Sequence, residues 1–69
     1  MRLTLVIPLY NEQESLRELY DRIGRALDPT DMDWDVLFID DGSTDGSLDV
    51  LRELHGSHGN VTVLSFGRN

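Results

Sequence analysis

The chain contains no cysteine among its 69 residues. No disulfide can therefore stabilise it, and the composition leaves its redox compartment open. Histidine occurs only twice, so metal ligands of the cysteine and histidine type are almost absent as well. A chain of this size buries only ~60% of the surface that its unfolded form exposes. We therefore expect its apolar segments to pack against further chain.

Basic residues are scarce too. Only 6 arginine and lysine residues stand against 13 aspartate and glutamate residues, and the formal net charge is −7. Proteins bind nucleic acid by displacing counterions from phosphates with positive side chains. The composition therefore argues against nucleic acid and against an anionic membrane surface as partners. The scattered acids predict a solvated surface.

Long apolar runs are missing. No run approaches the ~20 residues of a transmembrane helix, so we expect no membrane span in this segment. Residues 3–9 are apolar, but the run is short and no small-residue cleavage site follows it. We do not interpret it as a signal peptide, and we expect a cytoplasmic location.

Short apolar runs do alternate with helical patterns. The runs at residues 3–7, 34–39 and 61–66 predict strands. Apolar residues at helical spacing predict helices over residues 12–27 and 47–55. Residues 36–39 are apolar without interruption, which is typical of a parallel sheet with both faces covered by helices. The order predicts an α/β fold, a Rossmann-like βαβαβ three-stranded parallel sheet with right-handed crossovers.

Local signals mark the ends of these elements. Pro8 predicts that the first strand ends at Ile7, because the residue before a proline favours extended geometry. Asn11 is the expected N-cap of the first helix, with Glu14 as its partner in a capping box. Gly56 is the expected C-cap of the second helix. Residues 28–33 predict a loop.

Polar segments follow the first two predicted strands. Ligands of open α/β sheets bind beyond the carboxyl ends of the strands, and these segments therefore share the edge where a ligand is expected. After the first strand, a tyrosine ring could lie against a flat nucleobase, while the Asn and Glu side chains hydrogen-bond its edge. A strand stopped by proline and followed by a helix cap is the alternative. The polar residues are Tyr10, Asn11 and Glu12, then Asp40, Asp41 and Ser43.

Two adjacent acids, Asp40 and Asp41, end the second strand. Desolvation and mutual repulsion make this placement costly, and the cost indicates a function. A carboxylate there can accept a hydrogen bond from a base N–H or a ribose hydroxyl. A turn that leads into a helix capped by Asp45 or Ser47 is the alternative.

Together the two segments resemble the paired signatures of family 2 glycosyltransferases with the GT-A fold. They are residues 6–12, Val-Ile-Pro-Leu-Tyr-Asn-Glu, and residues 40–45, Asp-Asp-Gly-Ser-Thr-Asp, and their spacing is also what that family shows. The closest resemblance is to the branch that transfers a sugar onto a polyprenyl phosphate, such as dolichol-phosphate mannosyltransferase. Residues 65–69, Ser-Phe-Gly-Arg-Asn, add minor support, because that branch often has an Arg-Asn pair there.

The resemblance implies that residues 1–69 are a single partial domain, the N-terminal nucleotide-binding part of a GT-A domain. The whole protein would be an inverting enzyme that transfers a sugar from a UDP- or GDP-linked donor to a lipid phosphate, at the cytoplasmic face of a membrane. Ile39 would pack against the base and Asp41 would hydrogen-bond it. Asp40 would orient backbone or assist the ribose. The implied nucleotide-binding residues are Pro8, Tyr10, Asn11, Glu12, Ile39, Asp40 and Asp41.

The resemblance places no catalytic or metal-binding residue in this chain. In the family, a later Asp-x-Asp motif holds Mg²⁺ or Mn²⁺, which neutralises the leaving diphosphate as a Lewis acid. That motif and the acceptor-binding groups would lie outside residues 1–69. The isolated chain is therefore expected to lack transferase activity.

Other classes fit less well. A dinucleotide-binding domain or a P-loop needs a glycine-rich first turn, and residues 8–12 contain no glycine. Residues 41–52 fit much of an EF-hand calcium loop, but Arg52 stands where a bidentate glutamate belongs. A non-catalytic acidic α/β fragment with no ligand of its own remains a further alternative.

Overall fold

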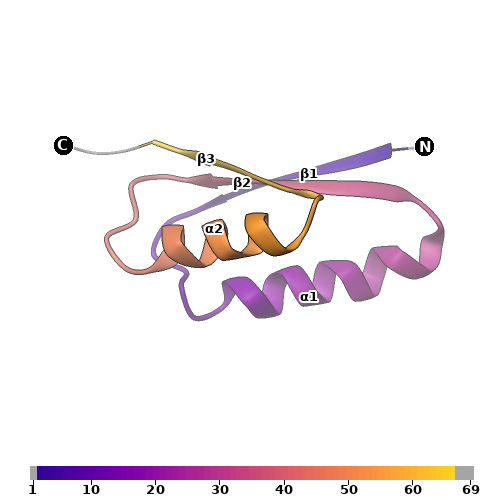
Figure 1. The fold of residues 1–69 in the computed structure, drawn as a ribbon, viewed down its shortest axis with the longest axis horizontal. Coiled ribbons are helices and arrows are strands. Elements are labelled where there is room, and N and C mark those ends of the chain that lie inside the picture. The colour runs from indigo at the N-terminus through magenta and orange to yellow at the C-terminus, as the bar shows by residue number, and fades with distance from the viewer. Residues whose placement is uncertain (1, 67–69) are drawn as a thin grey trace.

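The secondary-structure elements follow the expected order. The computed structural model describes residues 2–66. Three strands alternate with two α-helices (Figure 1), which confirms the predicted α/β fold. The elements are β1 (Arg2–Leu9), α1 (Leu16–Leu27), the 3₁₀ turn η1 (Asp28–Thr30), β2 (Asp33–Asp40), α2 (Ser47–Ser57) and β3 (Val61–Ser65).

The strands form one parallel sheet with β2 in the centre. Leu5, Val36 and Val61 occupy one level of the sheet, and Leu9 pairs with Asp40 at the end of β1. In a parallel sheet, residues paired in this way point to the same face. The register therefore brings the chain that leaves β1 beside the chain that leaves β2.

One face of the sheet carries the core. Phe38 of β2 and Leu51 of α2 are 0% exposed, and Leu16 at the start of α1 is 1% exposed. Along β2, buried residues alternate with half-buried ones, as the period of two in a strand requires. The buried apolar residues are Leu9, Leu16, Val36, Phe38, Val50, Leu51, Leu54 and Val61.

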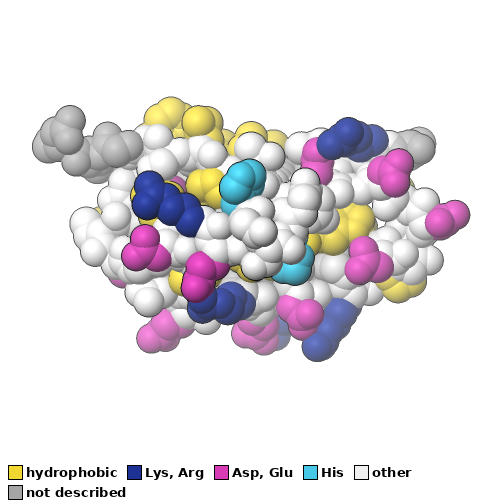
Figure 2. Space-filling view, viewed as in Figure 1, with side chains coloured by type: hydrophobic (Ala, Val, Ile, Leu, Met, Phe, Trp, Pro, Cys, Tyr) yellow, Lys and Arg dark blue, Asp and Glu magenta, His cyan; other side chains and the backbone are white. Residues whose placement is uncertain are grey.

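The expectation that helices cover both faces of the sheet is wrong for the described residues. Both helices lie on the same side of the sheet (Figure 1), because consecutive crossovers of one hand between neighbouring strands place their helices on one face. On the opposite face, Val6 is 57% exposed and Leu64 is 45% exposed. Figure 2 shows hydrophobic side chains along the sheet side of the molecule, whereas acidic and basic side chains mix over the helices.

The first strand and first helix differ from prediction at their ends. β1 continues through Pro8 to Leu9, because it is an edge strand and one side of its backbone needs no ladder partner. The expected N-cap Asn11 is wrong: α1 begins at Leu16, four residues after its expected start at residue 12, and its N-cap is Ser15. Asn11 lies outside the helix with φ 51°.

The ends of the other elements differ less from their predicted positions. α2 continues through Gly56 and its C-cap is His58, whose N–H donates to the carbonyl of Leu54 over 3.0 Å. The prediction of Gly56 as C-cap is therefore wrong. Residues 28–30 of the expected loop form η1, and β2 already begins at Asp33. β3 ends at Ser65, one residue before its expected end.

Candidate functional site

Two loops leave the sheet side by side at the carboxyl ends of β1 and β2. The first loop comprises residues 10–15 and the second loop comprises residues 41–46. The N–H of Asp41 donates to the carbonyl of Leu9 over 3.0 Å, so the loops start at adjacent points. We call this side of the molecule the carboxyl edge. The prediction that both polar segments share one edge is confirmed.

Asn11 joins the two loops through several hydrogen bonds. Its side-chain Oδ1 accepts hydrogen bonds from the N–H groups of Thr44, over 2.8 Å, and Asp45, over 3.3 Å. Its Nδ2 donates to Thr44 Oγ1 over 3.3 Å. Its own N–H donates to Ser43 Oγ over 2.9 Å. The amide therefore binds a loop that lies more than thirty residues away in sequence.

Glu12 and Gln13 extend this connection. The N–H of Glu12 donates to Ser47 Oγ over 2.9 Å. Gln13 donates its N–H to Asp45 Oδ2 over 3.4 Å and accepts the N–H of Gly46 at Oε1 over 2.8 Å. We call the bonds of Asn11, Glu12 and Gln13 to residues 43–47 the inter-loop network.

Asp45 has its charge stabilised within this network. Hydrogen bonds from Ser47, its hydroxyl first, hold the pKa of the Asp45 carboxyl below its usual value. The N–H of Ser47 donates to Asp45 Oδ1 over 2.8 Å. Gly46 is the N-cap of α2 and makes no side-chain cap. Asp45, one residue earlier, therefore supplies the acceptor for the first N–H of the helix, as the capping alternative anticipated.

Asp40 lies beneath the loops. It is 1% exposed, because it shares the helix-covered face of β2 with Val36 and Phe38. Its Oδ1 accepts a hydrogen bond from the hydroxyl of Ser43. Its backbone carbonyl accepts the N–H of Phe66 over 2.9 Å. The side chain thus supports the second loop from inside the molecule.

The remaining predicted residues lie on the outside of this edge. Pro8 pairs with Ile39 across β1 and β2, on the sheet face that the helices leave open. Tyr10 is 52% exposed, and Asp41 is exposed at the start of the second loop. Glu12 is exposed, and its Oε2 accepts the hydroxyl of Ser15 over 3.1 Å.

Sequence reasoning missed several members of the inter-loop network. Gln13 and Thr44 were not among the predicted site residues, and Ser47 was expected only as a possible cap. The available signal was composition: residues 43–47 are small or polar, and such side chains often bond to the backbone of a turn. Their partners, however, belong to another loop, and a local pattern does not identify them.

Metal binding in general, and the calcium-loop alternative in particular, can be compared with this geometry. No group of three or more His, Cys, Asp or Glu side chains within residues 2–66 could hold a metal ion, and we assign no metal ligand there. In the suggested calcium loop, both Asp45 oxygens accept backbone N–H groups and the Ser43 hydroxyl is bonded to Asp40 and Asn11. A strand, not a helix, precedes that loop.

Membrane insertion is a separate question. Within residues 2–66, neither α-helix has the length and apolar character that a membrane span requires. The expected Arg68-Asn69 pair lies outside the described residues.

Comparison with known proteins identifies the family. Residues 4–69 match the model of glycosyl transferase family 2. The chain is 47% identical to an undecaprenyl-phosphate 4-deoxy-4-formamido-L-arabinose transferase of Sodalis glossinidius, with 99% of this chain and 21% of that protein covered. It is 40% identical to the protein of that name in Edwardsiella ictaluri, with 96% and 21% covered. It is 36% identical to the uncharacterized glycosyltransferase YkcC of Bacillus subtilis, with 96% and 20% covered.

The chain thus spans only 20–21% of the length of these relatives. The relatives named for undecaprenyl phosphate agree with the resemblance to transferases that use a polyprenyl phosphate. The family match covers almost the whole chain and includes both polar segments of the carboxyl edge. The chain belongs to glycosyl transferase family 2.

Proposed function

We propose that this chain is the nucleotide-binding part of an inverting glycosyltransferase that transfers a sugar from a nucleotide diphosphate sugar to a polyprenyl phosphate. The observation that carries the proposal is the carboxyl edge, where Tyr10 and Asp41 are exposed on two loops that hydrogen bonds join to each other. Family membership supports the donor class and inversion. The names of the relatives support a polyprenyl phosphate as the acceptor.

Each exposed residue has a role that its chemistry suits. The ring of Tyr10 can stack on a base, an interaction that contributes roughly 1–3 kcal/mol per base. The side-chain oxygens of Asp41 can accept hydrogen bonds, and both uracil and guanine offer ring N–H donors. Pro8 and Ile39 supply an apolar wall beside them, and Glu12 lies at the polar rim. We assign no catalytic step and no cation to these residues.

Calorimetric titration of the chain with UDP and GDP tests the proposal, after far-UV circular dichroism has shown that the chain is folded. We expect saturable binding of one of the two nucleotides. Asp41→Asn should weaken it by roughly 10–100-fold, because a hydrogen bond to a charged group contributes about 1.5–3 kcal/mol. Sugar transfer by the isolated chain is not expected.

Asp31→Asn is the matched control. It makes the same charge change at the opposite end of β2, and asparagine tolerates the φ of 60° found there. Asp31→Asn should bind nucleotide like the wild type. If a folded wild-type chain binds neither nucleotide, or if both substitutions weaken binding equally, the proposed site is wrong. A non-catalytic fragment without a ligand would give the first of these results.

A further inference from the structure

The amide of Asn11 is already occupied inside the protein. A side-chain amide oxygen has two acceptor positions, and the N–H groups of Thr44 and Asp45 use both. The Nδ2 donates to the hydroxyl of Thr44. A nucleotide that took the Asn11 oxygen would have to displace a backbone N–H of the second loop. This arrangement leaves the Asn11 oxygen no free position for the N–H of a base.

The backbone of Asn11 also connects the first loop to the second. Its φ of 51° lies in the left-handed region, which asparagine tolerates better than most residues. This turn directs the N–H of Asn11 to the hydroxyl of Ser43, and that hydroxyl donates to the buried carboxylate of Asp40. A chain of hydrogen bonds therefore runs from the first loop through the second loop into the core.

The neighbouring part of the network is closely packed. A Cβ added to Gly46 would lie 2.7 Å from the Cδ and Nε2 atoms of Gln13. The side chain of Gln13 therefore rests directly on the second loop, where its Oε1 accepts the Gly46 N–H. Tyr10 precedes this connected stretch, and Asp41 lies at the start of the loop to which it is connected.

We infer that Asn11 is a positioning residue, which fixes the first loop to the second so that Tyr10 and Asp41 are held at the same edge of the sheet, and that it does not itself contact the nucleotide. The inference rests on the proposed nucleotide site for its purpose, but the hydrogen bonds exist without a ligand. Fixing both loops before binding spares the cost of ordering them during binding. Affinity should then depend on Asn11 through loop order.

Amide hydrogen exchange of the full chain, followed by NMR without nucleotide, tests the connection itself. Asn11→Gly removes the side chain but accepts the positive φ without strain. Asn11→Asp keeps both the φ preference and the acceptor oxygens. We expect the exchange of the Thr44 and Asp45 amides to rise about tenfold in Asn11→Gly, as for the loss of one hydrogen bond, and to stay near the wild-type rate in Asn11→Asp.

The His58 amide is the internal control, because it bonds to Leu54 at the far end of α2. Its exchange should be the same in all three proteins. If Asn11→Gly leaves the Thr44 and Asp45 amides as protected as in the wild type, the inference is wrong. A general rise that includes His58 would also contradict it, because Asn11 would then serve overall stability and not loop position.

A double-mutant cycle in nucleotide binding separates positioning from contact. Asn11→Gly removes the side-chain bonds to the Thr44 and Asp45 N–H groups, whereas Ser43→Ala removes the bond to the Asn11 N–H. Each should weaken binding about tenfold, and the double variant should bind little worse than either, because both release the first loop from the second. Effects that multiply to about 100-fold would assign Asn11 an independent contact with the nucleotide and overturn the inference. If the wild type binds neither UDP nor GDP, the proposed function fails, and the exchange experiment still decides the role of Asn11.

Discussion

Different interactions stabilise the two ends of the sheet. At the carboxyl edge, directional hydrogen bonds between two loops hold exposed side chains in place. At the amino ends of β2 and β3, aromatic packing dominates: the ring centroids of Tyr20 and Trp34 lie 5.7 Å apart, and those of Tyr20 and His58 lie 4.4 Å apart. Directional hydrogen bonds specify position, whereas ring packing contributes stability mainly through buried apolar area. This difference agrees with the proposal that the carboxyl edge binds the nucleotide, whereas the amino end contributes stability.

Individual polar groups at the amino end support the rings. The hydroxyl of Tyr20 donates to Asn60 Oδ1 over 2.6 Å, and the indole Nε1 of Trp34 donates to Asp28 Oδ1 over 2.9 Å. Burial raises the pKa of the Tyr20 hydroxyl, so this donor stays protonated at neutral pH. The cluster connects α1 with the starts of β2 and β3 and contains none of the proposed nucleotide-binding residues.

The strongest test of the comparison is Trp34→Ala. Removing this half-buried ring and its hydrogen bond should lower the free energy of unfolding by about 2–3 kcal/mol, measured by urea denaturation. Nucleotide affinity of the folded fraction should stay unchanged. Asn11→Gly should instead lower nucleotide affinity and leave the free energy of unfolding nearly unchanged. Trp34→Phe, which keeps an aromatic ring but loses the bond to Asp28, should lose less stability. A large loss of affinity in Trp34→Ala would show that the two ends are coupled.

A smaller, local effect is expected from pH. The pKa of Asp45 is lower in the folded chain than the ordinary 3.8, so its contribution to stability is present above that value and is lost as the pH falls through the folded pKa. The pKa of Tyr20 is raised above 10.0, so its contribution is present below that value and is lost as the pH rises through the folded pKa.

Acid should therefore loosen the contacts of Asp45 at the carboxyl edge, and also those of Asp35 beside Thr4 and Arg2, since the pKa of that carboxyl is lowered too. Alkali should loosen the contact of Tyr20 with Asn60. Residue-resolved NMR through both ranges measures these responses, with the Gln13 and Ser47 amides reporting on Asp45 and the Asn60 side chain reporting on Tyr20. Asp45→Asn should remove the acid response at Gln13 and leave the alkaline response intact. Simultaneous changes of the Gln13 amide and the Asn60 side chain would contradict the proposed separation.

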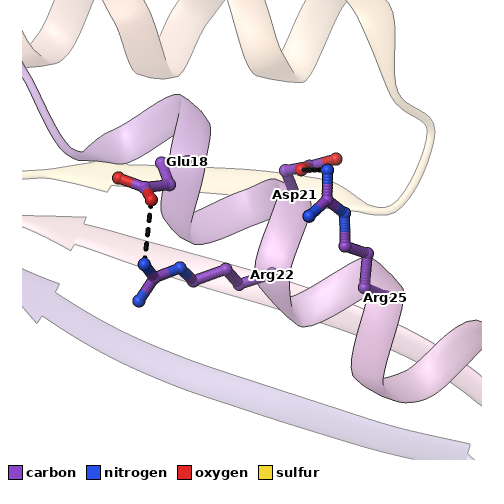
Figure 3. A network of polar contacts seen from close by, with 4 residues as sticks. All are labelled: Glu18, Asp21, Arg22 and Arg25. Carbon is purple, nitrogen blue, oxygen red and sulfur yellow. Dashed lines mark hydrogen bonds and ion pairs between the residues drawn. The ribbon is translucent and has the colours of Figure 1, made fainter.

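The smallest effect is expected on the outer surface of α1. Glu18 pairs with Arg22 over 2.9 Å and Asp21 pairs with Arg25 over 2.8 Å (Figure 3), and all four side chains are more than half exposed. Such pairs contribute about 0.3–0.5 kcal/mol and weaken in salt. Arg25→Gln should therefore cost at most about 0.5 kcal/mol in low salt and nothing measurable in 1 M NaCl (~3 Å screening length). A larger loss would show that this helix surface takes part in the amino-end packing.

Some features could be predicted from sequence because their causes are local. Apolar runs and helical spacing identified every strand and α-helix, since they reflect the periods of two and 3.6 residues that decide which face is buried. Asn11 and Glu14 also formed a locally valid capping pattern, but the prediction was wrong. The N–H groups of Thr44 and Asp45 competed for the same amide oxygen, and nothing in residues 11–14 reveals that competition.

The uninterrupted apolar run of β2 concealed a second feature. Leu37 and Ile39 are half-buried on the open face, whereas Val36, Phe38 and Asp40 are buried under the helices. With apolar residues on both faces, the sequence showed no alternation that would have assigned Asp40 to the inside. Its role in supporting Ser43 became visible only once the helices were placed on one face.

The sequence by itself determined the order of the elements, the parallel sheet and the paired segments that mark the family, because each is recognised from patterns within short runs of neighbouring residues. Only the tertiary structure decided that Asp40 lies inside, that Tyr10 and Asp41 remain exposed, and that Asn11 joins the loops. Those outcomes depend on hydrogen-bond partners such as Asn11 and Thr44, which lie 33 residues apart in the sequence. Such partners meet only because the register of β1 against β2 brings the two loops together.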